Sequence, residues 1–130
     1  MKIHVNAITL AVKDLRAMKK FYTENFGLEV IAENEKVIIL KLDNLLLTLC
    51  EQALFNQYAN ISNMAEGKGF YLTIRVPSQT AVDERIKQLE TQGVEINRQP
   101  APAFWGGYSG FAADPEGNSW EICYNPYAGN

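Results

Sequence analysis

The sequence contains an internal repeat, and this feature restricts its possible folds more than any other. Residues 3–12 alternate between apolar and polar side chains, as a half-buried β-strand does. Asp14 then stands where a helix N-cap belongs, and apolar residues at helical spacing continue to Gly27. Three short β-rich runs follow, at residues 28–32, 37–42 and 45–50. The first copy of the repeat is therefore predicted to be a βαβββ unit.

The same order of elements begins again near residue 70. An alternating run at 70–76 precedes Ser78, a second candidate N-cap, and apolar residues at helical spacing then continue to Gly93. The next strand is weakly indicated, and a loop is expected over residues 98–109, where two prolines stiffen the chain. The remaining elements are strands at 110–113 and 119–124, joined by a turn at 114–117. The second copy is also predicted to be βαβββ.

The length of the chain, 130 residues, is typical of one domain. We expect one domain over residues 1–130, built of a unit at 1–51 and a unit at 68–126. The segment 52–67 between them is too apolar for a free tether and too irregular for a confident helix, which favours a packed linker. The predicted fold class is α+β.

Composition excludes several kinds of partner and site. Twelve Lys and Arg against fifteen Asp and Glu give a net charge of −3, without the basic excess that nucleic-acid binding needs. The single histidine, His4, cannot build a His-rich metal site within one chain, and an exposed or strand-edge role is expected for it. No segment approaches the roughly 18 apolar residues of a membrane helix. We therefore expect a cytoplasmic protein without nucleic-acid or membrane partners.

Several sequence motifs, together with the repeat, resemble those of a known superfamily. The motifs are VKDL before the first helix, FYTENFGLEV at its end, and FWGGYSG followed by DPEGNSWEICYNP near the C-terminus. They are similar to the vicinal oxygen chelate superfamily of glyoxalases, bleomycin-resistance proteins and extradiol dioxygenases, and in particular to a small bacterial glyoxalase-like branch. The resemblance covers nearly the whole chain. It implies a curved mixed sheet, or half-barrel, with a concave cavity, helices on the outer face, and a homodimer.

Strand alternation divides the side chains of the predicted sheets into two faces. One parity is apolar and can pack under the helices. The other parity carries small, polar or ionisable side chains, which suit the lining of a cavity. Its candidate ligand-binding residues are Ala7, Thr9, Thr48, Cys50, Tyr71, Thr73, Glu121 and Cys123. Whether Arg75, which has the same parity, reaches the cavity stays open.

Three aromatic residues in the glycine-containing loop are further candidates. Phe104, Trp105 and Tyr108 are expected either to form a lid or stacking wall over the ligand, or to pack on the sheet or a subunit interface. The two cysteines, Cys50 and Cys123, have no CxxC spacing and are expected to be reduced thiols that behave as small hydrophobic residues.

The resemblance also implies four metal-ligand positions, which metal-using members fill with His, Gln or Glu. In this sequence they fall at Ala7, Thr48, Tyr71 and Glu121, of which only Glu121 is a competent ligand. One carboxylate falls short of the three protein ligands that a catalytic metal usually has. We therefore expect no metal and no cofactor. Glu121 is then a general base or a counter-ion for a ligand, or else a structural carboxylate satisfied by Tyr71, Arg75 or backbone N–H groups.

Three functions of different classes follow from these expectations. The favoured one is a metal-free protein that holds a small organic molecule in the cavity, and the acidic net charge slightly favours a cationic ligand. The first alternative is a metal-dependent glyoxalase-type lyase, an isomerase or a dioxygenase, against which the missing ligands argue. The second alternative is a dimeric interaction module with a filled cavity. A metal-independent enzyme with Glu121 as its base lacks a second catalytic group.

Overall fold

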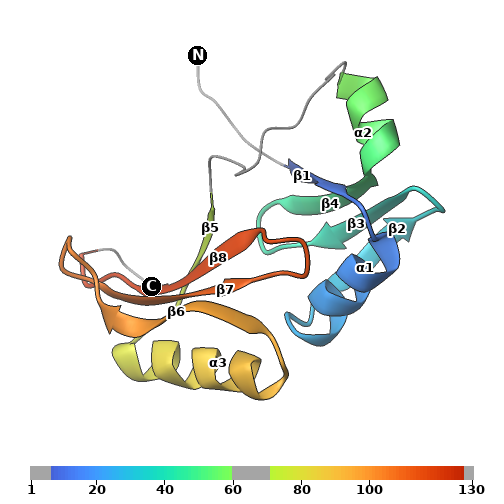
Figure 1. The fold of residues 1–130 in the computed structure, drawn as a ribbon. Coiled ribbons are helices and arrows are strands. Elements are labelled where there is room, and N and C mark those ends of the chain that lie inside the picture. Colours follow the sequence, from blue (N-terminus) through green and yellow to red (C-terminus); the bar gives the residue numbers. More distant parts are fainter. Residues whose placement is uncertain (1–6, 60–70, 128–130) are drawn as a thin grey trace, which may run out of the picture. The chain divides into compact units, whose positions relative to one another are not determined.

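The computed structural model of the chain describes residues 7–59 and 71–127 (Figure 1). The chain divides into two compact units, residues 1–66 and 67–130, and each is described by itself. The α2 helix (Gln52–Ala59) belongs to the first of these units. The predicted strand residues 3–6, including His4, lie outside the described residues.

The first unit is a four-stranded mixed sheet with two helices (Figure 1). Its strand order is β1-β4-β3-β2, in which β1 pairs with β4 in parallel and the other pairs are antiparallel. The elements are β1 (Ala7–Val12), α1 (Leu15–Glu24), β2 (Glu29–Glu33), β3 (Val37–Lys41), β4 (Leu46–Glu51) and α2 (Gln52–Ala59). The predicted βαβββ order of this unit is confirmed, and the boundaries of β2, β3 and β4 differ from the predicted ones by at most one residue.

The α1 helix covers one face of this sheet and supplies Met18, Phe21 and Tyr22 to its core. It begins after Asp14, whose carboxylate accepts a hydrogen bond of 3.0 Å from the backbone N–H of Ala17, as the N-cap prediction requires. Met18 and Tyr22 on this helix are fully buried, as are the leucines of β3 and β4 that face it. The core of the unit therefore lies between α1 and the sheet, and it leaves the opposite face for other roles.

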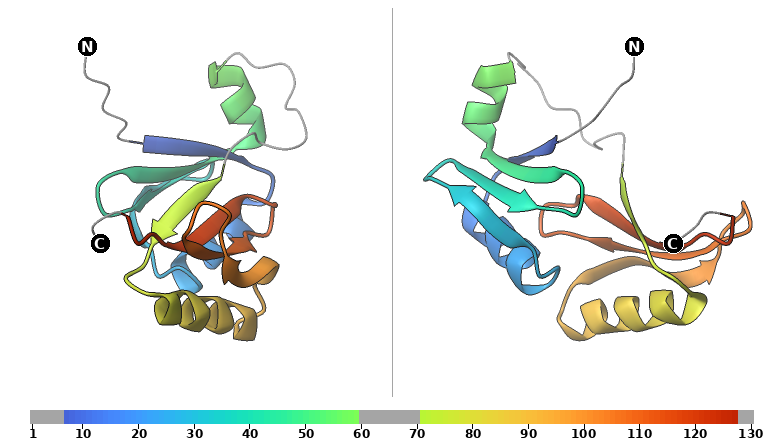
Figure 2. Two further views of the ribbon diagram at one scale, coloured as in Figure 1. Left: turned by 90° about the vertical axis from the view of Figure 1, so that its left-hand side faces the viewer. Right: turned by 180° about the vertical axis from the view of Figure 1, so that it is seen from behind.

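The α2 helix refines one prediction, because residues 52–59, which were expected to begin a packed linker, form a regular helix. It follows β4 without a break, contacts β1 and β4, and lies on the side of the sheet away from α1 (Figures 1 and 2). Ala11 and Cys50, on the strands that α2 contacts, are both buried. Tertiary packing stabilises this short helix, whose weak periodicity gave little signal in the sequence. The rest of the predicted linker, residues 60–67, lies outside the described residues.

The second unit repeats the architecture of the first, with strand order β5-β8-β7-β6. Its β5 strand pairs with β8 in parallel, and the other two pairs are antiparallel. The elements are β5 (Leu72–Arg75), α3 (Gln79–Thr91), β6 (Glu95–Pro102), β7 (Tyr108–Ala113) and β8 (Ser119–Tyr124). The expected fold class, α+β with tandem βαβββ units, is confirmed. The strands form two four-stranded sheets, neither of which closes into a barrel.

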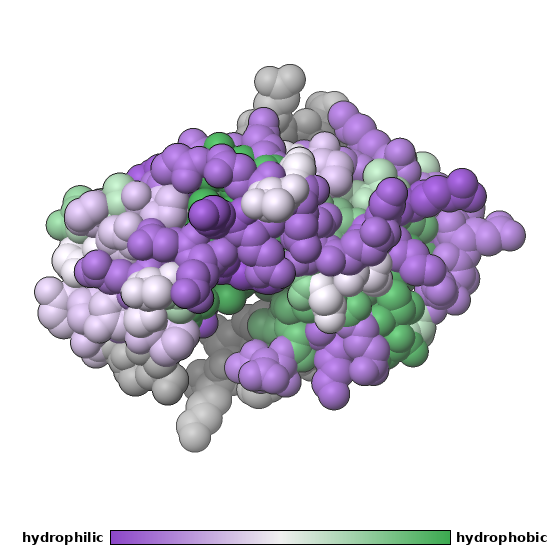
Figure 3. Space-filling model, turned by 90° about the horizontal axis from the view of Figure 1, so that it is seen from below, coloured by the Kyte–Doolittle hydropathy of each residue, from purple (hydrophilic) through white to green (hydrophobic). Residues whose placement is uncertain are grey.

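The α3 helix is amphipathic, as its sequence predicts. Ser78 is its N-cap and accepts a hydrogen bond of 3.0 Å from the N–H of Ala81. Val82, Ile86 and Leu89 are buried. The surface on the side where α3 lies is largely hydrophilic (Figure 3). Among the described residues of this unit, α3 is the one helix, and it covers one face of the second sheet.

The β6 strand corrects a second prediction, because the sequence indicated only a weak strand here and a loop from residue 98. The structure shows an eight-residue strand that includes Pro100 and Pro102. β6 is the edge strand of its sheet and its pairing with β7 shifts register on both sides of Arg98, and both features accommodate proline. The connecting loop is correspondingly short, residues 103–107. It is closed by a hydrogen bond of 2.8 Å from the N–H of Ala103 to the carbonyl of Gly107.

The turn between β7 and β8 forms where the sequence predicts it. The N–H of Gly117 donates to the carbonyl of Asp114 at 3.0 Å, and Gly117 has a φ of 83°. The buried Asp114 carboxylate also accepts hydrogen bonds from the backbone N–H groups of Glu116 and Asn118, both at 2.9 Å. This turn fixes the register of β8, the strand that carries Glu121. In the described parts of the chain, no helix is long and apolar enough to cross a membrane.

Candidate functional site

The open face of each sheet, defined as the face away from α1 or α3, carries most of the predicted site residues. In the second unit, a Cβ built on Gly110 would lie 3.0 Å from Ile86 of α3, so Gly110 points toward the helix. By alternation, the neighbouring Phe111 belongs to the open face. The sheet register places Thr73, Glu121 and Phe111 side by side on β5, β8 and β7.

Glu121 is a buried carboxylate on this face, with 7% of its surface exposed. The hydroxyl of Thr73 donates a hydrogen bond of 3.0 Å to its carboxylate oxygen Oε1. The sequence predicted Thr73 as a site residue but not as the hydrogen-bond partner of Glu121. Alignment of the repeat compares Thr73 with Thr9 and says nothing of which residues face each other on neighbouring strands. The parallel pairing of the first and last strands of a βαβββ unit was the available signal.

An aromatic pair lies on the same face as Glu121. The rings of Tyr71 and Phe111 meet edge to face, with centroids 5.1 Å apart and an interplanar angle of 81°. Tyr71 is 54% exposed, so part of its ring is available to a ligand. Phe111 was not predicted as a site residue, although alternation from Ser109 would have indicated it. We call Thr73, Glu121, Tyr71 and Phe111 the Glu121 cluster.

The next row along the same strands joins Arg75, Cys123 and Ser109. Burial, and secondarily the charge of Glu121, raise the pKa of the Cys123 thiol, whereas the Arg75 guanidinium acts in the opposite direction. The positive charge of Arg75 therefore lies close enough to affect the pKa of Cys123, in the row next to the Glu121 cluster. Ser109 is fully buried, and its hydroxyl has no hydrogen-bond partner among the residues that the structure describes.

The three loop aromatics are not brought together over one face. Phe104 is fully exposed, and the indole of Trp105 lies against the backbone of Gly107, where a Cβ would collide with it. Tyr108 lies on the α3 side of its sheet, and its hydroxyl donates a hydrogen bond of 2.7 Å to Asp83 on α3. This hydrogen bond, with burial and the charge of Asp83, raises the pKa of Tyr108. Tyr108 therefore faces away from Glu121.

The open face of the first unit holds the remaining candidates. Ala7 and Thr9 on β1 are exposed, and Thr48 on β4 is half-buried beside Thr9. Cys50 is buried next to α2, and its burial, followed by the charge of Glu51, raises the pKa of its thiol. The two cysteines are free, and neither has the lowered pKa that a nucleophilic thiol needs.

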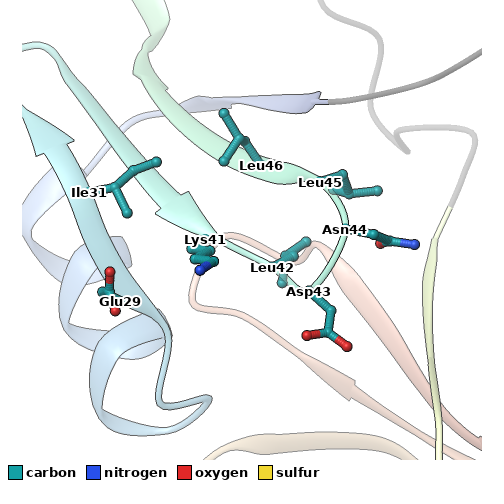
Figure 4. Close-up of a pocket in the computed structure, with 8 residues that line it drawn as sticks. All are labelled: Glu29, Ile31, Lys41, Leu42, Asp43, Asn44, Leu45 and Leu46. Carbon is teal, nitrogen blue, oxygen red and sulfur yellow. The ribbon is translucent and has the colours of Figure 1, made fainter.

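An open pocket of about 650 Å³ lies at the end of the first sheet where β3 turns into β4 (Figure 4). The register joins Ala7, Leu46, Lys41 and Glu29 in one row across all four strands. The pocket extends from this row to Ile31 on β2 and to the turn between β3 and β4. It is lined by Glu29, Ile31, Lys41, Leu42, Asp43, Asn44, Leu45 and Leu46. None of these residues was predicted, because alternation was applied to β4 and not to β2 and β3.

The side chains at the four implied metal positions do not fit a metal centre. Ala7 offers a methyl group, Thr48 an alcohol and Tyr71 a phenol, which leaves Glu121 as the one carboxylate. Zinc and iron centres need several imidazole, thiolate or carboxylate donors. Among the described residues, no group of three or more His, Cys, Asp and Glu side chains lies close enough to hold a metal ion.

The tandem units and their polar open faces define an α+β protein of the vicinal oxygen chelate type. A family model described as the Glyoxalase/Bleomycin resistance protein/Dioxygenase superfamily matches residues 4–122. The chain belongs to this superfamily, which confirms the family that the sequence motifs resemble. No curated protein matches the chain.

Solved structures show the same fold. A glyoxalase-related enzyme from Fulvimarina pelagi is 28% identical with a TM-score of 0.85, over 95% of this chain and 88% of that chain. A glyoxalase/bleomycin resistance protein/dioxygenase from Nocardioides is 20% identical with a TM-score of 0.85, over 100% and 88%. A lactoylglutathione lyase from Agrobacterium tumefaciens is 21% identical with a TM-score of 0.74, over 98% and 97%. These similarities establish the fold and leave the activity to the site residues.

Proposed function

We propose that the protein binds a small organic molecule at the Glu121 cluster without a metal ion. The observation that carries this proposal is the burial of the Glu121 carboxylate on the face of its sheet away from α3. Removing an ionised carboxylate from water is unfavourable unless polar or charged groups replace the water. The neutral hydroxyl of Thr73 replaces part of that hydration, and a donor or cation on a ligand would replace more.

The aromatic pair favours an organic cation as the ligand. Tyr71 is partly exposed and contacts Phe111, the cross-strand partner of Glu121, and an alkylated ammonium is attracted both to an aromatic ring and to a carboxylate. Arg75 lies at the other end of β5 and would repel a cation there. We therefore propose that the cation binds on the Tyr71 side of Glu121, away from Arg75.

The lyase, isomerase or dioxygenase alternative requires a different donor set. Such chemistry uses a metal ion as a Lewis acid, and three of the four implied ligand positions carry Ala7, Thr48 and Tyr71. The enzyme names of the similar structures apply to those proteins and do not assign an activity to this chain. For this chain the donor chemistry favours binding over metal-dependent catalysis. A homodimer and a cytoplasmic location stay predictions.

The test is a titration of the protein with tetramethylammonium chloride, followed by the amide NMR signals of β5 and β8. Saturable shifts at Thr73 and Glu121 are expected, and Glu121→Gln should weaken binding by about tenfold, as loss of a charged partner does. Glu84→Gln, on the exposed side of α3, is the matched control and should bind as the unaltered protein does. Equal affinity of the Glu121 variant would remove this carboxylate from the proposed site.

A further inference from the structure

The pocket on the open face of the first unit is independent of the Glu121 cluster, because all its lining residues belong to β2, β3, β4 and the turn between β3 and β4. Its volume of about 650 Å³ lies within the range of small-molecule sites. It also lies in the row that begins at Ala7 on β1. The alanine methyl group leaves the end of this row free of a bulky side chain.

Two opposite charges stand next to each other in this pocket. Glu29 on β2 and Lys41 on β3 are direct cross-strand partners, and Figure 4 shows Lys41 between Glu29 and the turn residues. Side chains at such positions begin about 5 Å apart at their Cβ atoms. In the part of the chain that the structure describes, no ion pair within 4 Å joins them, whereas Lys19 and Glu33 do form one at 2.9 Å. The ammonium and the carboxylate are thus both available to one ligand.

The remainder of the lining is mostly aliphatic. Leu42 and Leu45 from the turn region and Leu46 from β4 are half-buried, and Ile31 on β2 is 46% exposed. Exposed aliphatic side chains gathered at one pocket gain free energy when an apolar group covers them. Asp43 and Asn44 add polar groups at the turn (Figure 4). The pocket therefore combines an apolar surface with one cation and two carboxylates.

We propose that this pocket binds a zwitterionic α-amino acid with an aliphatic side chain. The ligand carboxylate pairs with the Lys41 ammonium, the ligand ammonium pairs with the Glu29 carboxylate, and the side chain covers Leu42, Leu45 and Leu46. A simple carboxylic acid would be repelled by Glu29 and Asp43, and a simple amine would be repelled by Lys41. Only a ligand that carries both charges close together satisfies both partners at once.

L-leucine is the probe, and three truncated molecules test its three groups. Isocaproate lacks the ammonium, isoamylamine lacks the carboxylate, and glycine lacks the aliphatic side chain. A titration followed by the amide NMR signals of residues 41–46 should show saturable shifts with L-leucine. Each truncated molecule should bind about fivefold more weakly or worse, as expected for loss of one exposed charge pair or of the apolar contact. Absence of saturable shifts with L-leucine, or equal binding of isocaproate, would overturn the proposal.

Variants of the charged pair separate this site from others on the protein. Lys41→Gln and Glu29→Gln should each weaken L-leucine about fivefold, whereas Lys41→Arg keeps the charge and should retain binding. Lys36→Gln and Glu35→Gln, exposed in the turn between β2 and β3, are matched controls. Glu121→Gln should leave L-leucine binding unchanged, so this proposal and the one for the Glu121 cluster fail separately. Unchanged affinity in both pocket variants would overturn the assignment of the pair.

Discussion

Thr73 and Glu121 are cross-strand partners in the parallel β5–β8 pair, and the Thr73 hydroxyl donates to the Glu121 carboxylate at 3.0 Å. This relationship links the stability of the second unit to its candidate site. Glu121 stands at a position where the family resemblance implies a metal ligand, yet in this chain it accepts a hydrogen bond from the Thr73 hydroxyl and is the cross-strand partner of Phe111, whose ring contacts Tyr71. The carboxylate is thus oriented by a neutral donor.

The first prediction concerns this hydrogen bond. Thr73→Val keeps the shape of the side chain and removes the donor, which leaves the buried carboxylate less satisfied, so the free energy of unfolding should fall by about 1–2 kcal/mol. Urea denaturation measures this change. Thr9→Val is the matched control, because Thr9 holds the equivalent position in β1 and pairs with Thr48 instead of a carboxylate. An equal loss in both variants would show that the hydrogen bond adds nothing.

The second prediction concerns the β7–β8 turn. Asp114 is buried and accepts hydrogen bonds from the N–H groups of Glu116 and Asn118 and from the Asn118 side chain at 2.7 Å. Asp114→Ala leaves these donors unpaired and should lower the free energy of unfolding by about 2–3 kcal/mol. Asp43→Ala, in an exposed turn of the first unit, should change it by less than about 0.5 kcal/mol. Thermal or urea unfolding that ranks the two variants equally would contradict this role.

Elements of the fold that depend on nearby residues were predicted from the sequence, whereas elements that depend on contacts between distant residues were not. Asp14 and Ser78 were correctly predicted as N-caps because an N-cap needs only its own side chain and the next backbone turn. The α2 helix was missed because its stability comes from contact with β1 and β4. The β6 strand was only weakly predicted, and its extension through Pro100 was missed, because proline in a sheet is tolerated mainly on an edge strand and edge position is a property of the whole sheet.

The candidate site shows the same division. Alternation placed Glu121 on the correct face from sequence alone, because side-chain parity is local to a strand. The roles of Thr73 and Phe111 depend on register between strands, which one sequence does not reveal. The pocket around Lys41 needs the positions of three strands and a turn together. Tyr108 was expected in a loop, but β7 begins at Tyr108, two residues earlier than predicted. Strand alternation then places Tyr108 on the same face as Gly110, toward α3.

The third prediction concerns the two thiols. Because burial raises the pKa of both Cys50 and Cys123 above the ordinary 9.0, their alkylation by iodoacetamide should need a higher pH in the folded protein than in urea. The folded state holds these protons after the unfolded state has released them. The thiols therefore stabilise the fold below about pH 9, and this contribution is lost as the pH rises further.

A variant distinguishes the two thiols. Arg75→Gln removes the charge that lowers the pKa of Cys123, so the alkylation profile of Cys123 should move to higher pH while that of Cys50 stays in place. Mass spectrometry of the alkylated peptides measures the two profiles separately. A shift of both cysteines, or of neither, would contradict a local effect of Arg75.

The fourth prediction concerns Tyr108. Its hydrogen bond to Asp83 raises its pKa, so the phenol should ionise at a pH above the ordinary 10. Asp83→Asn removes the negative charge and should bring the titration of Tyr108 back toward the ordinary value. NMR of ring-labelled tyrosine follows each phenol separately, and a profile unchanged in the variant would contradict the role of Asp83.

The fifth prediction concerns metal binding, because metal-dependent catalysis needs several metal-ligating side chains and metal-free ligand binding needs none. Protein purified without chelators or affinity tags and dialysed against zinc, nickel or manganese should retain well under one ion per chain, and Glu121→Ala should not change that amount. The reason is that Ala7, Thr48 and Tyr71 supply no imidazole or carboxylate. Elemental analysis by mass spectrometry measures the content. Near-stoichiometric metal that is lost in Glu121→Ala would mean that Glu121 acts with donors other than those three, and metal-dependent catalysis would then become the favoured function.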